Sequence, residues 1–215
     1  MNNLLILTAL ALTLAQQTFA QCEPEEQKDT YRNRAYAMGT VSCGEKEGVW
    51  KYYDRKDRLI KKINFKKGQF NGEKTIWYKT GQMKSAEYYT EGKLNGTVSR
   101  WTIDGILIEE SNYKDGALHG TSKKWTDEGI LVAVTNYDNG VKTGEFERYW
   151  VSGKLKEKGS YLNSQLDGLY QSYYENGKLS SQIHYATGIQ HGNYTTYFET
   201  GQISSNGNFE NGEQN

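Results

Sequence analysis

A period of 24 residues runs through most of this chain and constrains its fold more than any other feature. A glycine recurs at this interval with no insertion or deletion, at Gly48, Gly72, Gly96, Gly120, Gly144, Gly168 and Gly192. Self-similarity at a fixed period of this size is the sequence signature of a repeat architecture. We therefore divide residues 48–215 into seven repeats and number each from its opening glycine, which is position 0.

Three further positions hold large apolar or aromatic residues in all seven repeats. Position 5 is aromatic throughout, with Tyr53, Trp77, Trp101, Trp125, Tyr149, Tyr173 and Tyr197. Position 11 is Leu59, Met83, Leu107, Leu131, Leu155, Leu179 and Ile203. Position 17 is Phe65, Tyr89, Tyr113, Tyr137, Tyr161, Tyr185 and Phe209. Repeats of this kind contact only their neighbours, so each column predicts a line of side chains along the array.

The second repeat shows the predicted local structure. Two runs rich in β-forming residues, Glu73–Tyr78 and Met83–Tyr89, flank a turn that ends at Gly81, which predicts a β-hairpin. Positions 11 and 17 are separated by an even number of residues, so we expect them to share one face of the sheet. The fold class predicted is all-β, an elongated antiparallel meander of seven 24-residue hairpin repeats.

The residue before each opening glycine is restricted in type. It is Glu47, Asn71, Asn95, His119, Thr143, Asp167 or His191. Asn, Asp and His are the non-glycine residues that best tolerate left-handed backbone, so we expect this column to serve turns.

The N-terminal segment stands outside the repeats. Residues 1–20 contain an apolar run from Leu4 to Leu14 and end in Thr18-Phe19-Ala20, which is typical of a cleaved signal peptide. The run is shorter than the ~20 apolar residues that span a bilayer. We therefore predict a secreted, periplasmic or cell-envelope protein in which residues 21–47 form a degenerate N-terminal cap.

The chain has two cysteines, Cys22 and Cys43. In an oxidising compartment they could form a disulfide that staples the cap, and the alternative is two independent thiols. The cysteine spacing and the three histidines do not form a metal-binding pattern, so we expect no metal and no cofactor.

Charge and histidine usage narrow the functional classes. The 26 basic residues balance the 26 acidic ones, so the field that nucleic-acid binding needs is missing. His119 and His191 lie in the column before the opening glycine, and His184 occupies a strand position held elsewhere by Asn and Tyr. Because no set of unlike catalytic groups interrupts the repeat, we expect a non-enzymatic protein with no catalytic residues.

Two columns are candidates for binding a partner. Position 6 carries large aromatic residues in four repeats, namely Tyr78, Trp150, Tyr174 and Phe198. Position 4 carries a short basic column, namely Arg100, Lys124 and Arg148. The alternative for the basic column is a solvated face balanced by nearby glutamates. The aromatic residues at position 5 are either a packing ladder or a platform for a glycan.

Several segments resemble the MORN repeat, and most closely its variant class. They are YKDGALHG from Tyr113, YENGKL from Tyr174 and YTEGKLNG from Tyr89. The resemblance implies an elongated hairpin array used for scaffolding or protein binding, for membrane lipids in some members, and as an antitoxin in others.

Our hypothesis is an exported protein–protein interaction scaffold. The alternatives are a module for glycan or phospholipid head groups and an antitoxin-like or immunity-like protein. The final strand predicted, Ile203–Phe209, could also pair with another chain and cause self-association.

Overall fold

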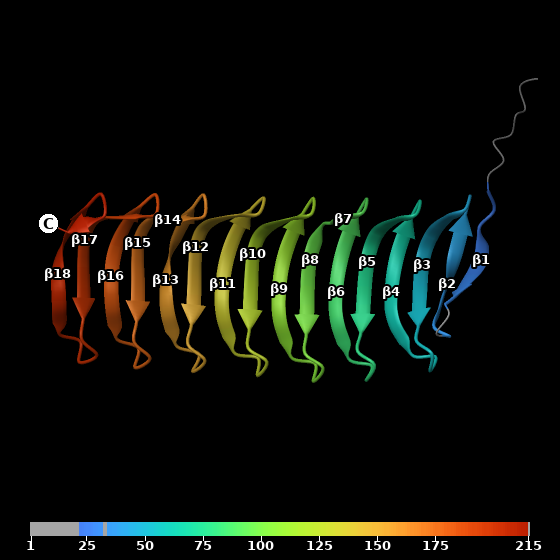
Figure 1. Cartoon of the computed structure of the whole chain (residues 1–215), viewed down its shortest axis with the longest axis horizontal. Coiled ribbons are helices and arrows are strands. Elements are labelled where there is room, and N and C mark those ends of the chain that lie inside the picture. The colour runs from blue at the N-terminus through green and yellow to red at the C-terminus, as the bar shows by residue number, and fades with distance from the viewer. Residues whose placement is uncertain (1–21, 32–33, 215) are drawn as a thin grey trace, which may run out of the picture.

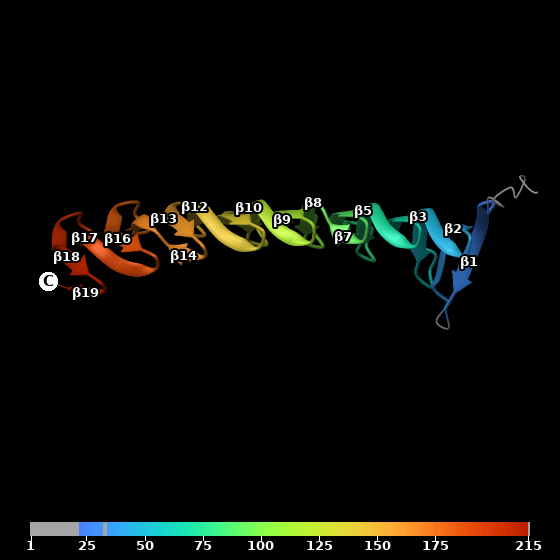
Figure 2. The same cartoon turned by 90° about the horizontal axis from the view of Figure 1, so that it is seen from above.

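The structure is a single antiparallel β-sheet. The computed structural model describes residues 22–31 and 34–214, and all regular structure within them is β-strand. Its nineteen strands belong to one sheet, and the chain crosses this sheet back and forth from one end of the long axis to the other (Figure 1). Seen from above, the array is one thin band (Figure 2). The predicted all-β meander is thus confirmed, whereas the predicted signal peptide lies outside the described residues.

The cap and the first repeats begin the meander. Their strands are β1 (Glu25–Thr30), β2 (Tyr36–Ser42), β3 (Glu45–Tyr53), β4 (Leu59–Lys66), β5 (Gln69–Trp77), β6 (Met83–Thr90), β7 (Lys93–Leu94), β8 (Gly96–Trp101) and β9 (Leu107–Lys114). The remaining strands are β10 (Ala117–Trp125), β11 (Leu131–Asp138), β12 (Val141–Tyr149), β13 (Leu155–Leu162), β14 (Gln165–Leu166), β15 (Gly168–Tyr173), β16 (Leu179–Ala186), β17 (Ile189–Tyr197), β18 (Ile203–Glu210) and β19 (Glu213–Gln214).

Short turns line one long edge of the sheet. In each of them positions 19 and 20 both have positive φ, as at Lys67 and Gly68, which is the conformation of a type I′ hairpin turn. The backbone N–H at position 20 donates to the carbonyl at position 22 of the preceding unit, at the start of the strand that follows the preceding short turn, at 2.8–2.9 Å. These donors are Gly68, Gly92, Gly116, Gly140, Ser164, Gly188 and Gly212. Each short turn is therefore fixed to the one before it.

The column before the opening glycine serves turns, as predicted, but it does so without the left-handed backbone on which that prediction was based. The opening glycines themselves have positive φ, as at Gly48 and Gly72. The preceding side chains cap the next short turn instead. Glu47 accepts a hydrogen bond from the N–H of Lys67 at 2.8 Å, Asn71 from Glu91 at 3.3 Å, and Asp167 from Thr187 at 3.2 Å.

Position 17 lies on one face of the sheet, which we call the packed face. Tyr89 at position 17 donates to Glu87 at position 15, and Glu87 forms an ion pair with Lys74 at position 2. Position 5 lies on the opposite face with position 3, as the hydrogen bond from Tyr149 to Glu147 shows.

A register shift separates positions 4 and 5 in every repeat, and position 11 pairs with position 5 across the hairpin, as Leu59 does with Tyr53. Because this bulge inserts one residue, even spacing no longer places positions 11 and 17 on one face. The expectation that they share a face was wrong.

Positions 2 and 15 form the central ladder of the packed face. At its N-terminal end Trp50 and Ile63 are buried in a cluster with Phe65, Ala37 and Val41. The indole N–H of Trp50 donates to the carbonyl of Thr40 at 2.9 Å. Beside this cluster, Cys22 and Cys43 form a disulfide with their Cα atoms 5.3 Å apart. The cap is therefore covalently closed next to the cluster.

Candidate interaction surfaces

The aromatic residues predicted at position 6 mostly join one repeat to the next. Three of them place a polar tip on the backbone carbonyl at position 5 of the following repeat. The hydroxyl of Tyr78 donates to Trp101 at 2.9 Å, the indole N–H of Trp150 to Tyr173 at 3.2 Å, and the hydroxyl of Tyr174 to Tyr197 at 2.6 Å. These three side chains are half-buried. The strands of each hairpin are joined by a longer loop, such as residues 78–82 between β5 and β6, and these long loops line the second long edge of the sheet. The three side chains tie this edge together.

Phe198 differs from the other residues at position 6. It has no polar tip, and 54% of its surface is exposed. The four residues predicted as one binding patch are therefore three inter-repeat contacts and one exposed ring.

The basic column is largely neutralised. Arg100 forms an ion pair with Glu109, and Arg148 forms one with Glu157. Both are cross-strand partners in register. Lys124 is exposed and lies opposite Glu109 on the neighbouring strand. The three cations thus share one strip with acidic residues and do not form a uniformly basic surface.

The aromatic residues of position 5 are half-buried rather than a flat exposed platform. Tyr149 donates to Glu147 and Tyr173 donates to Gln171 at 3.3 Å, in both cases within one strand. Burial and the contact with Glu147 raise the pKa of Tyr149 to about 12. The phenol therefore stays protonated and acts as a hydrogen-bond donor at neutral pH.

His184 has a structural explanation. Its Nδ1 lies 3.1 Å from the carbonyl of Asn193 on the next strand. Asn112 and Asn136 occupy the same position in their repeats and donate to the equivalent carbonyls at 3.0 and 2.8 Å. His184 thus replaces an asparagine in a cross-strand ladder.

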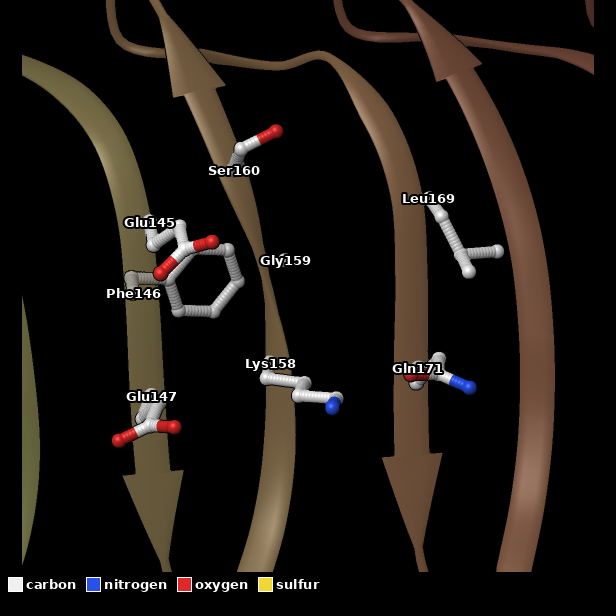
Figure 3. Close-up of a pocket in the computed structure, with 8 residues that line it drawn as sticks. All are labelled: Glu145, Phe146, Glu147, Lys158, Gly159, Ser160, Leu169 and Gln171. Carbon is white, nitrogen blue, oxygen red and sulfur yellow. The ribbon is translucent and has the colours of Figure 1, made fainter.

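A shallow hollow lies on β12, β13 and β15 (Figure 3). Its polar side chains include Glu147, Lys158 and Gln171, which lie in a row across the three strands, with Leu169 nearby. The ring of Phe146 packs beside Gly159, where an added Cβ would come within 3.1 Å of the ring. The hollow offers polar and apolar contacts to a ligand, but its groups do not form a nucleophile–base pair.

The described residues contain no cluster of His, Cys, Asp or Glu suited to a metal ion. Within residues 22–31 and 34–214, no helix has the length and apolar character needed to cross a membrane.

Sequence reasoning missed a group of three lysines on the packed face, Lys46, Lys61 and Lys74. They come from β3, β4 and β5 and lie over aromatic rings. They occupy different positions of the repeat, namely 22, 13 and 2, so no column of the sequence displays them. Strand pairing could have revealed the group. Lys74 pairs with Ile63 at position 15, and Lys61 is two residues from Ile63 on the same strand and the same face.

Comparison with known families agrees with this geometry. The model of the MORN repeat variant matches residues 46–67, 142–163, 166–186 and 190–211. Each matched segment includes one five-residue loop, such as residues 54–58 between β3 and β4, and strand residues on both sides of it. This chain belongs to the MORN repeat variant family. No curated protein matches the chain.

MORN repeats are commonly protein-binding or membrane-binding modules, and the family is not known for enzymatic activity. The three repeats between the first and second matched segments have the same strand pairing and the same short turns. The MORN architecture therefore continues across residues that the family model does not match.

Proposed function

We propose that this MORN-repeat protein is an exported, non-enzymatic scaffold that binds another protein through the opposite face of its sheet. The observation that carries the proposal is the row formed by positions 1 and 16 on this face. Val49, Tyr88 and Leu169 are 41%, 46% and 42% exposed there, among the polar residues of the asparagine ladder. Apolar contacts interspersed with hydrogen-bonding groups are typical of a protein interface.

The rigidity of the sheet supports binding to a macromolecule. Both long edges carry bonds from one repeat to the next, through the short turns and through the side chains at position 6. A preformed surface loses little conformational entropy on binding. The half-buried position 5 column, by contrast, does not favour a glycan platform.

Export is supported by two observations of different kind. The sequence of residues 1–20 has the pattern of a cleaved signal, and Cys22 and Cys43 form a disulfide. Structural disulfides persist mainly in oxidising compartments.

A pull-down from the cell envelope with residues 21–215 tests the proposal. We expect the native chain to retain a protein that the double variant Tyr88→Glu, Leu169→Glu loses, because charges on this row prevent apolar contact. The matched control is Ile103→Glu, Val151→Glu, which adds the same charge at exposed residues of the long loops.

Retention of the partner by the control and its loss by the face variant would support the proposal. Equal retention by all three chains would refute binding through this face. Retention of glycans or lipid vesicles without any protein would refute the scaffold and favour a ligand-binding module.

A further inference from the structure

The lysine group on the packed face carries one cation more than its surroundings neutralise. Lys46 pairs with Asp29 at 3.2 Å, and Lys74 pairs with Glu87 at 2.7 Å. Within the described chain no carboxylate forms an ion pair with Lys61. Its ammonium instead lies 4.4 Å from the centre of the Tyr52 ring. Three lysines and two carboxylates leave a local net charge of one positive unit.

The surplus charge lies in an aromatic environment. The ammonium of Lys46 also approaches Tyr52, at 5.5 Å from the ring centre, and stands 3.7 Å over the ring of Trp50. Lys46 and Lys61 therefore share Tyr52. The rings provide apolar surface beside the cations, and each cation is also attracted to the ring that it contacts.

The environment of Lys61 is unfavourable for a cation without an anion. Lys61 is half-buried. Burial lowers the pKa of its ammonium, and the neighbouring charges of Lys74 and Lys46 lower it further. An anion placed beside Lys61 would relieve both effects, since an opposite charge favours the charged form of the amine.

The carboxylates already present belong to this balance. Burial opposes ionisation of Glu87, but hydrogen bonds from Lys74 and Tyr89 outweigh burial and lower the pKa of its carboxyl. The pKa of Asp29 is also lowered, by a hydrogen bond from Gln27 and by its contact with Lys46. Glu87 and Asp29 are therefore ionised at neutral pH, and the net charge of the group is the surplus on Lys61.

We propose that the packed face of the first two repeats holds a site for the carboxylate of an acidic protein segment, with Lys61 as the direct contact and Tyr52 as the adjoining apolar surface. A single surplus charge matches one carboxylate. It leaves the second charge of a phosphate dianion unbalanced, and it does not match an anionic bilayer, whose recognition uses clusters of about four to eight basic residues. The site lies on the face opposite to that used by the proposed scaffold function, so it goes beyond that function and fails independently of it.

Titration of the full chain with a hexaglutamate peptide at low ionic strength, followed by calorimetry, tests this site. We expect Lys61→Gln to weaken binding by about tenfold or more, as expected for loss of one charge-assisted contact. Lys61→Arg keeps the charge and should retain most of the affinity. The matched control is Lys62→Gln, because Lys62 is the next residue on β4, points to the opposite face and pairs with Glu73 at 3.7 Å.

The control should bind hexaglutamate with a Kd within about twofold of that of the native chain. Added salt should weaken the binding of hexaglutamate to the control and to the native chain, because the site is partly exposed. Nitrogen NMR of Lys61 provides a readout that a folding defect would not mimic, since its pKa should rise when the peptide binds.

Three results would overturn the proposal. Lys61→Gln could bind as tightly as the native chain, or Lys62→Gln could lose as much affinity as Lys61→Gln. The third result is Lys61-dependent binding of inorganic phosphate or of phosphatidylcholine–phosphatidylserine vesicles without binding of hexaglutamate, which would assign the site to phosphate groups.

Discussion

Positions 2 and 15 of the packed face hold very different side chains in the first repeat and in the middle of the array. In the first repeat Trp50 and Ile63 fill the centre of an apolar cluster. In the middle of the array Ser111 and Ser122 fill the same ladder, both buried, with their hydroxyl oxygens 2.7 Å apart. The short turns and strand pairing are the same in both regions. Backbone bonds therefore keep the register, and side-chain volume is free to vary and to set local stability.

The largest effect is expected at Trp50. Trp50→Ala removes a fully buried indole and leaves a cavity, which costs about 3–5 kcal/mol of unfolding free energy. Hydrogen exchange should show the loss of protection mainly in β2 to β4, because a repeat contacts only its neighbours. Ser111→Ala is the contrasting variant and should cost about 1–3 kcal/mol by leaving Ser122 without its partner. Equal losses would contradict the difference between the two regions.

Removal of the disulfide should affect the cap alone. Replacing Cys22 and Cys43 by serine frees a loop with a sequence separation of 21 residues, for which loop entropy predicts a loss of about 3 kcal/mol. We expect β1 and β2 to exchange faster while β12 to β18 keep their protection. Faster exchange throughout the sheet would mean that the array unfolds as one unit instead.

Gly159 lies at position 15, and Gly39 lies at the equivalent place in the cap. Substituting alanine at each glycine would compare the space available on the packed face in these two regions. A Cβ at Gly39 would lie 2.5 Å from the Trp50 ring, and one at Gly159 would lie 3.1 Å from the Phe146 ring. Gly39→Ala should therefore cost about 1–3 kcal/mol by overpacking, and Gly159→Ala less. Chemical denaturation measures both. A larger loss of unfolding free energy for Gly159→Ala would show that the Phe146 ring moves aside less readily than the Trp50 ring.

The smallest effect concerns the first long loop, where Asp54 occupies position 6. A hydrogen bond from Arg58 lowers the pKa of Asp54 to about 2, against the opposing effect of desolvation, and backbone N–H groups contribute. Because the folded pKa is depressed, the stabilisation is complete above about pH 4 and is lost as pH falls towards 2. Carbon NMR of the carboxyl should give a midpoint near 2, which should return towards the ordinary value in Arg58→Ala.

The architecture could be predicted from the sequence because the 24-residue period and the residues that form the turns can be read within each repeat, without knowledge of tertiary contacts. The glycine at position 20 and the strand runs in each repeat were enough to define hairpins and their order. The bulge between positions 4 and 5 could not be predicted, since it depends on how Leu59 pairs with Tyr53 across the loop. That single inserted residue reversed the face expected for position 11.

The candidate surfaces were less predictable for a related reason. Tyr78 and Phe198 occupy the same position, yet the hydroxyl of Tyr78 bonds to the next repeat and Phe198 has no such group. The lysine group lies at three different positions, in the cap, the first repeat and the second repeat, so only the pairing of β3, β4 and β5 brings it together. Aligning the repeats by position shows the residues that they share, whereas the candidate binding sites depend on residues that differ from one repeat to another.

The bond from each short turn to the one before it also bears on how such a molecule changes in length. The N–H of Gly68 meets the carbonyl of Lys46, and each later donor meets the carbonyl the same number of residues behind it. Excising one exact period would bring the next donor to an equivalent carbonyl and leave the edge unbroken. Since one period is two strands, each gain or loss alters the long dimension by about 9.6 Å. The length of the sheet can therefore change only in steps of one pair of strands if the bonds along this edge are to be kept.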